Sequence, residues 1–271
     1  MKKQKDQPKT SGRLLALALL LLLIGGVLGG LAFAFTSLRS LWLEQSVITD
    51  IATQVKVDSG KMVKADAIRE VLGLRNGVNL AEIDFAERRR QALEKYPTIS
   101  AMTITRQLPD GVTITIEERE PEFRLGISGK RADTGRVVDR EGVVFPCRRG
   151  TATLPILRER APGTANGDRL GPRAAAALRL LLAVREPGLS QLGVQEVDVT
   201  KPDWLLVTLG DGSRAKIAWE GMDKEDRTDL PAMRTVLAQL ACAVDQHLLN
   251  ETKIWNATIP GTIFADEQGV H

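Results

Sequence analysis

Residues 99–117, ISAMTITRQLPDGVTITIE, decide the fold of the first part of the chain. Residues 99–107 are typical of a strand, residues 112–117 alternate apolar with polar side chains, and Leu108-Pro109-Asp110-Gly111 lies between the two runs. Such alternation predicts strands with one buried face, and Pro followed by Asp-Gly favours a tight turn. The stretch therefore predicts a β-hairpin.

The residues before this hairpin predict a strand and two helices. Residues 55–57 alternate as in a strand, and the apolar positions of 65–72 recur with a helical period. Asp84 and Glu87 form a capping-box-like start for a second helix, which Pro97 ends. The resulting order, β-α-α-β-β, predicts an α+β unit in which two helices cover one face of a three-stranded sheet.

An uncharged stretch, residues 14–35, precedes this unit. At about 1.5 Å per residue it is long enough to span the ~30 Å hydrocarbon core of a bilayer. The tail 1–13 holds five Lys or Arg and one Asp, and a basic flank of this kind stays in the cytoplasm. We therefore expect one transmembrane helix, with the rest of the chain outside the inner membrane. A cleaved signal peptide is the alternative, because Ala32-Phe33-Ala34 resembles an A-x-A cleavage site.

The net charge of +3 does not indicate a nucleic-acid-binding protein. The tail 1–13 alone contributes +4, so the remaining residues sum to −1. Nucleic-acid-binding proteins concentrate positive charge on the folded domain. We therefore expect no nucleic-acid partner.

Residues suited to catalysis are few. The chain has two histidines, His247 and His271, and no Walker phosphate loop, H-E-x-x-H or G-x-S-x-G motif. Glu117, Glu118 and Glu120 cluster, but adjacent strand residues point to opposite faces, and a solvated strand end explains them. We expect no enzyme, no cofactor and no metal.

The two cysteines, Cys147 and Cys242, leave two alternatives open. An external compartment would allow them to form a disulfide. The alternative is two separate buried thiols, because Cys242 falls on the apolar side of a helix predicted over 230–248.

The chain from residue 119 onward predicts a second, mixed and β-rich domain. Hairpins are predicted at 136–145 and at 204–219, with turns at Asp139-Arg140-Glu141-Gly142 and Gly210-Asp211-Gly212. Two helices interrupt the strands, one over 174–184 with Pro172 in its first turn and one over 230–248.

The order of elements and the local sequence motifs of the first unit resemble those of the POTRA domain of the FtsQ/DivIB bacterial cell-division proteins. The matching residues are Val57, Ala67-Ile68, Leu72-Gly73-Leu74, Gly77-Val78-Asn79-Leu80, Ile83-Asp84, Leu93, Pro97-Thr98-Ile99, Ala101, Ile104, Arg106, Leu108-Pro109-Asp110, Ile114, Ile116 and Glu118-Arg119-Glu120-Pro121. The predicted hairpin at 136–145 resembles the one that opens the second domain of that family. The resemblance thus implies a POTRA domain followed by an FtsQ-type β domain.

The resemblance also implies a function. Family members are non-enzymatic scaffolds that link cytoplasmic and external division proteins while the septum forms. We expect a single-pass protein of the inner membrane at the division septum, with its N-terminus in the cytoplasm and its C-terminus in the periplasm. The implied partners are other divisome membrane proteins, similar to FtsB and FtsL, and no small-molecule substrate is implied.

In the family, the last strand is an open sheet edge to which FtsB adds a strand, an interaction based on main-chain hydrogen bonds. Here the alignable stretch, Asn256-Ala257-Thr258, departs from the family's Asp-Leu-Arg-like strand, which leaves the register open. The nearby apolar residues that are candidates for partner binding are Trp255, Ile259, Ile263 and Phe264. The alternative is that these side chains bury inward against the helix over 230–248.

A second candidate contact lies in the predicted membrane helix. Two overlapping G-x-x-x-G spacings are formed by Gly25, Gly26, Gly29 and Gly30. Small residues let helices approach closely in lipid, so this strip is a candidate for packing against another septal membrane helix. The alternative is chance, because glycine is common in membrane helices.

The expected organisation has six parts. They are a cytoplasmic basic tail, a transmembrane helix, a juxtamembrane linker, a POTRA domain, an FtsQ-type β domain and a C-terminal tail, at residues 1–13, 14–35, 36–49, 50–118, 119–266 and 267–271. Two other functions stay open. One is a POTRA-containing envelope protein-transport or assembly factor, since POTRA domains also occur in such proteins, and the other is an anchored envelope enzyme.

Overall fold

The computed structural model describes residues 22–23, 25–31, 33, 46–160, 164–219, 230–246, 254–259 and 261–265. Its helical residues between 22 and 33 are exposed. Within the described residues, no helix combines the length and the apolar character needed to cross a bilayer. The predicted span 14–35 falls for the most part outside these residues.

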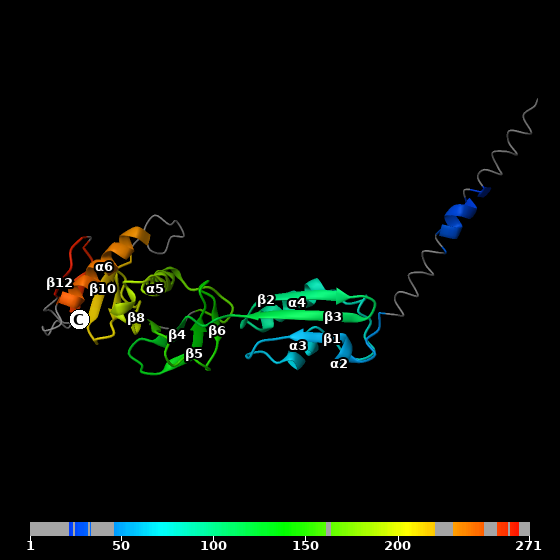
Figure 1. The fold of residues 1–271 in the computed structure, drawn as a ribbon, viewed down its shortest axis with the longest axis horizontal. Helices are drawn as coiled ribbons and strands as arrows, with labels where there is room; N and C mark the ends of the chain where they lie inside the picture. Colours follow the sequence, from blue (N-terminus) through cyan, green and yellow to red (C-terminus); the bar gives the residue numbers. More distant parts are fainter. Residues whose placement is uncertain are drawn as a thin grey trace, which may run out of the picture. The chain divides into compact units, whose positions relative to one another are not determined.

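The first sheet has the predicted order of elements. Its strands and helices are α2 (Ile51–Gln54), β1 (Val55–Asp58), α3 (Ala65–Val71), α4 (Phe85–Lys95), β2 (Ile99–Gln107) and β3 (Gly111–Glu118). The strand order is β1-β3-β2, with β1 parallel to β3 (Figure 1). The predicted β-α-α-β-β unit is therefore confirmed, with α2 as an additional short helix before β1.

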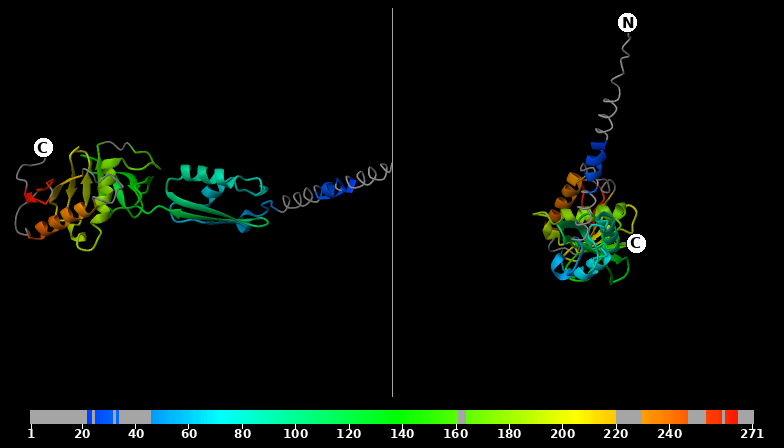
Figure 2. Two further views of the ribbon diagram at one scale, coloured as in Figure 1. Left: turned by 90° about the horizontal axis from the view of Figure 1, so that it is seen from above. Right: turned by 90° about the vertical axis from the view of Figure 1, so that its right-hand side faces the viewer.

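Local sequence signals explain the ends of these elements. Asp84 Oδ1 accepts hydrogen bonds from the backbone N–H groups of Ala86 (3.0 Å) and Glu87 (3.1 Å), which caps the N-terminus of α4 as predicted. Figure 2 shows α4 running along one side of the strands. Gly73 follows α3 with φ of 72°, a left-handed conformation that glycine adopts without strain.

The second sheet has nine strands. Its elements are β4 (Phe123–Ile127), β5 (Asp133–Val138), β6 (Val144–Pro146), β7 (Ile156–Glu159), α5 (Pro172–Ala183), η1 (Ser190–Leu192), β8 (Glu196–Asp198), β9 (Trp204–Thr208), β10 (Arg214–Ala218), α6 (Leu230–Gln246), β11 (Ile254–Ala257) and β12 (Phe264–Ala265). Their order in the sheet is β12-β11-β10-β9-β8-β7-β4-β5-β6.

The predicted hairpins and helices of this domain are present. The antiparallel pairs β5–β6 and β9–β10 are the two hairpins, and Pro172 is in the first turn of α5. Three parallel pairs, β4–β7, β7–β8 and β10–β11, were not predicted. The domain is thus mixed and β-rich, as expected, but its sheet is more continuous than two separate hairpins would make it.

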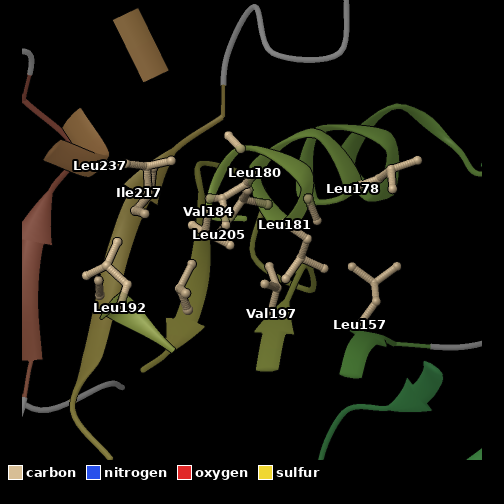
Figure 3. Packing of buried hydrophobic residues seen from close by; sticks show 14 of the residues in the cluster. Leu157, Leu178, Leu180, Leu181, Val184, Leu192, Val197, Leu205, Ile217 and Leu237 are labelled. Carbon is tan, nitrogen blue, oxygen red and sulfur yellow. The ribbon is translucent and has the colours of Figure 1, made fainter. Parts of the chain in front are cut away.

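One face of the nine-stranded sheet carries the core. Direct partners across six strands are Leu125, Leu157, Val197, Val207, Ala215 and Trp255, and each is buried. In Figure 3, side chains of α5 (Leu178, Leu180 and Leu181) and of Val184, which directly follows it, lie over the strands that carry Leu157, Val197 and Leu205. Leu237 of α6 belongs to the same cluster. Burial of this apolar row fixes the register of the strands, because a one-residue shift would expose it.

Candidate functional site

The end of the sheet formed by β11 and β12 is the candidate site. β12 is the outermost strand and pairs antiparallel with β11, with Trp255 opposite Ala265 and Asn256 opposite Phe264. No strand lies on the other side of β12 in the part of the chain that the structure describes. An outermost strand presents unpaired main-chain donors and acceptors to a further strand.

A tight connection joins the two strands. Asn256 Oδ1 accepts hydrogen bonds from the N–H (3.1 Å) and the hydroxyl (2.7 Å) of Thr258, a local contact that favours a turn at the end of β11. The N–H of Thr262 donates to the carbonyl of Ile259 (3.1 Å), and Gly261 has φ of 76°. The chain therefore reverses between β11 and β12 by side-chain and backbone hydrogen bonds. Pro260 lies outside the described residues.

Trp255 is not on the surface of this edge. Its side chain is 4% exposed and belongs to the core cluster. Its direct partner on β10 is Ala215, which is also buried. The indole therefore packs inward, which is the alternative that the sequence left open for this residue.

The other three candidates differ in exposure. Ile259 is 53% and Phe264 40% exposed, whereas Ile263 is half-buried against the core. Phe264 is the direct partner of Asn256, which in turn is opposite Lys216, so it lies on the outer, more polar face of the sheet. The structure thus brings an exposed aromatic side chain and an unpaired strand edge together.

The opposite end of the sheet is covered. In β6, the N–H of Val144 donates to Asp168 (2.9 Å) and its carbonyl accepts from Gly167 (2.7 Å). Val143 forms an antiparallel bridge with Arg169, and Pro146 has no N–H to donate. Within the described residues, β12 is therefore the end of the nine-stranded sheet that no other strand or loop pairs with.

The four glycines of the second candidate contact lie on helical residues. An added Cβ at Gly25, Gly26, Gly29 or Gly30 would meet nothing within 4 Å among the described atoms. Their role in helix packing stays a prediction.

Glu118 has a role that the sequence did not indicate. Its carboxylate accepts hydrogen bonds of 2.8 Å from the backbone N–H groups of Lys61, Met62 and Val63. An added Cβ on Gly60 would lie 2.1 Å from Glu118 Oε2, so the loop approaches the carboxylate closely. A solvated strand end is therefore the wrong description of this residue. Gly60 was the sequence signal that could have indicated the close approach of this loop to Glu118.

Arg119 and Asp139 form a further ion pair that the sequence did not indicate. Arg119 Nη1 lies 2.5 Å from Asp139 Oδ2, and Arg119 Nε donates to the carbonyl of Pro97 (3.0 Å). Asp139, in the turn between β5 and β6, is 2% exposed and also accepts from the N–H of Val143 (2.8 Å). This carboxylate thus holds the turn and the chain after β3 together.

Both cysteine thiols are free. Cys147 is half-buried, and Cys242 is exposed rather than on the apolar side of its helix. The reason is helical geometry, because Cys242 follows the buried Met233 by nine residues, about two and a half turns, and so lies on the opposite side of α6.

One carboxyl group outside the edge has a perturbed pKa. Burial raises the pKa of the Glu159 carboxyl above its ordinary value, and the attraction of Arg136 opposes this shift only in part. Glu159 is the last residue of β7.

Comparison with known proteins agrees with this architecture. Residues 52–119 match the POTRA domain of the FtsQ type. A cell division protein FtsQ from Corynebacterium glutamicum is 25% identical over 77% of this chain and 83% of its own length. The FtsQ of Streptomyces collinus is 24% identical over 81% of this chain and 78% of its own length. The FtsQ of Neisseria meningitidis serogroup B is 28% identical over 55% of this chain and 56% of its own length.

Proposed function

We propose that this chain, which carries an FtsQ-type POTRA domain and is a distant homologue of FtsQ proteins over most of its length, is a non-enzymatic scaffold of the divisome. It would link cytoplasmic and external division proteins during septum formation. Its place would be the inner membrane at the division septum, with a single pass, a cytoplasmic N-terminus and a periplasmic C-terminus.

The observation that carries this proposal is the β12 edge. A strand of a partner would add to β12 through main-chain hydrogen bonds, and the exposed side chains of Ile259 and Phe264 would provide apolar anchors. Trp255 would act from behind the edge, because its buried indole holds β11 in register with β10. The partner would be a divisome membrane protein similar to FtsB or FtsL.

The glycine strip would serve a second contact. If residues 14–35 cross the membrane, Gly25, Gly26, Gly29 and Gly30 would allow another septal membrane helix to pack closely. This contact would act together with the β12 edge, because two linked contacts bind more tightly than either alone.

The test compares two shortened chains in the native host, each with a fluorescent protein at the N-terminus. A chain ending at Thr258 lacks β12, and a chain ending at Asp266 retains it and serves as the matched control. The full chain and the control are expected to gather at midcell and to support separation of daughter cells. The chain ending at Thr258 is expected to fail in separation at equal abundance.

A substitution tests the same edge without removing it. Phe264→Asp places a charge on the exposed anchor, and Phe264→Leu keeps it apolar. We expect a division defect for the first and near-normal division for the second. The divisome proposal would be contradicted if the full chain were distributed uniformly in the membrane and cells divided normally after deletion of the gene. An envelope transport or assembly factor would then be favoured.

A further inference from the structure

A small basic pocket lies in the nine-stranded sheet domain, away from the β12 edge. Its volume is about 280 Å³, and it is formed by residues of β4, β5 and the segment 147–151 that follows β6. Its charged lining consists of Arg124, Arg136 and Arg148 together with Asp133. Three guanidinium groups thus face one carboxylate, which leaves the pocket with a net positive charge.

Two of the three arginines are held in place by protein atoms. Arg124 Nε donates to the carbonyl of Leu154 (3.1 Å), and its Nη1 lies 3.2 Å from Asp133 Oδ2. Arg136 Nη1 donates to the carbonyl of Thr164. A guanidinium has five N–H donors, so each of these contacts orients the group and leaves donors for a ligand.

The third arginine has no such contact. Within the described part of the chain, the Arg148 guanidinium has no hydrogen-bond acceptor or ion-pair partner. It lies over Gly135, where an added Cβ would be only 2.8 Å from Arg148 Nε. The absence of a side chain at Gly135 therefore gives this guanidinium its position at the pocket.

A buried hydroxyl completes the lining. Thr151 is 6% exposed and lines the pocket, and its Oγ1 makes a long contact of 3.4 Å to the carbonyl of Arg148. A hydroxyl can donate to an anion or accept from a guanidinium. The pocket thus combines charged and neutral donors around a small volume.

We propose that this pocket binds a phosphate group. Arginine recognises phosphate with paired, charge-assisted N–H···O bonds, and three guanidiniums against one carboxylate offer N–H donors to several oxygens of a phosphate group at once. The volume is at the low end for ligand pockets, which suits a small anion or a headgroup and not an extended ligand. The phosphate would be either a free anion or the phosphodiester of an anionic lipid headgroup.

The two cysteines provide a built-in test. Cys147 lines the pocket, whereas Cys242 is exposed on α6 and serves as the internal control. In the purified full chain, the rate of iodoacetamide alkylation of each thiol is measured by mass spectrometry, with inorganic phosphate or with chloride at equal ionic strength. If phosphate binds, Cys147 alkylation should slow about tenfold at ten times the dissociation constant, with Cys242 unchanged.

A matched pair of variants distinguishes a specific phosphate site from non-specific attraction of anions to the positively charged surface. Arg148→Ala removes the guanidinium in the lining, and Arg149→Ala removes a neighbour that is exposed, as Arg148 is, but is not part of the lining. The ratio of Cys147 rates with and without phosphate should approach one in Arg148→Ala and stay as in the native chain in Arg149→Ala. Circular dichroism checks that both variants fold. Equal loss of protection in the two variants would overturn the proposal.

The source of the phosphate is separated by a second probe, glycerophosphoglycerol, which carries a headgroup phosphodiester. Protection by inorganic phosphate alone would identify a free anion as the ligand, and protection by both probes would show that the pocket also accepts a headgroup phosphodiester. The experiment is repeated at tenfold lower salt, where charge screening is weaker. If neither probe changes the rate of Cys147 alkylation by more than about twofold relative to chloride at either salt concentration, the proposal is contradicted. Because no cell division is measured, this result is independent of the proposed function.

Discussion

Phe264 lies directly opposite Asn256 across the pair of β11 and β12, on the face of the sheet that points away from the core. Trp255, the residue before Asn256, therefore points to the other face and is buried. Two aromatic residues of one hairpin thus have different environments. Substitution of Trp255 should mainly affect stability, and substitution of Phe264 should mainly affect the proposed partner binding.

We expect Trp255→Ala to lower the free energy of unfolding by about 3 to 5 kcal/mol, because it leaves a cavity in the core. Phe264→Ala should lower it by less than about 1 kcal/mol, since that side chain is exposed. Urea unfolding of the purified chain, followed by circular dichroism, measures both values. Similar losses would mean that Phe264 is also part of the core.

Glu118→Gln should destabilise the protein by about 1.5 to 3 kcal/mol, because a carboxylate that accepts three backbone N–H bonds is replaced by a neutral amide. Glu117→Gln is the matched control, since Glu117 is the exposed neighbour on the same strand. The same urea unfolding measurement applies. Equal effects of the two substitutions would show that the contacts to residues 61–63 contribute little.

Removal of Arg119 should be costly because it leaves the buried Asp139 carboxylate unpaired. We expect Arg119→Ala to lower the free energy of unfolding by about 3 to 5 kcal/mol. Adding Asp139→Asn to this variant should restore part of the loss, because it removes the uncompensated charge. A double variant whose loss equals the sum of the two single losses would contradict the coupling of these residues.

Glu159 should make stability depend on pH. Its pKa is raised in the folded protein, so the folded state binds this proton more tightly than the unfolded state does. The stabilisation from this group is therefore complete below the unfolded pKa, about 4.3, and is lost as pH rises through the folded pKa. Glu159→Gln, which resembles the protonated form, should be more stable than the native chain at pH 7.

The difference in free energy of unfolding between Glu159→Gln and the native chain should become smaller below pH 4. Unfolding curves of both at several pH values provide the measurement, because the other titrating groups are common to them. If the difference in free energy of unfolding stays constant over the pH range, desolvation of Glu159 does not make stability depend on pH.

The first sheet could be predicted because its signals are local. Alternation in 112–117, a helical period in 65–72 and the cap at Asp84 each act within a few residues. The hairpins β5–β6 and β9–β10 have the same advantage, since a short turn fixes their pairing.

The parallel pairs of the second sheet could not be predicted in this way, because they join segments far apart in the sequence. β8 has only three residues, too few to show a period. The helices were nevertheless a signal, because α5 lies between the parallel strands β7 and β8, and α6 lies between β10 and β11. Parallel neighbours need a long crossover connection, and this connection is usually a helix.

The direction of Trp255 was open for a related reason. Ile254 and Trp255 are adjacent and both are buried, so β11 shows no alternation between an apolar and a polar face. Alternation identifies a strand with one solvated face, and it fails where two adjacent residues are both buried. The sequence could therefore place an apolar strand here but could not decide which side chains face a partner.

The coverage of β6 by residues 167–169 has a consequence for stoichiometry. A sheet that is closed at one end can accept a strand only at the other, so each chain would engage one partner strand and the addition would stop there. Even pairing between two copies through β12 would end at a dimer, because the nine-stranded sheet of neither copy would offer a second uncovered edge. The described sheet therefore favours assemblies of fixed size over open filaments.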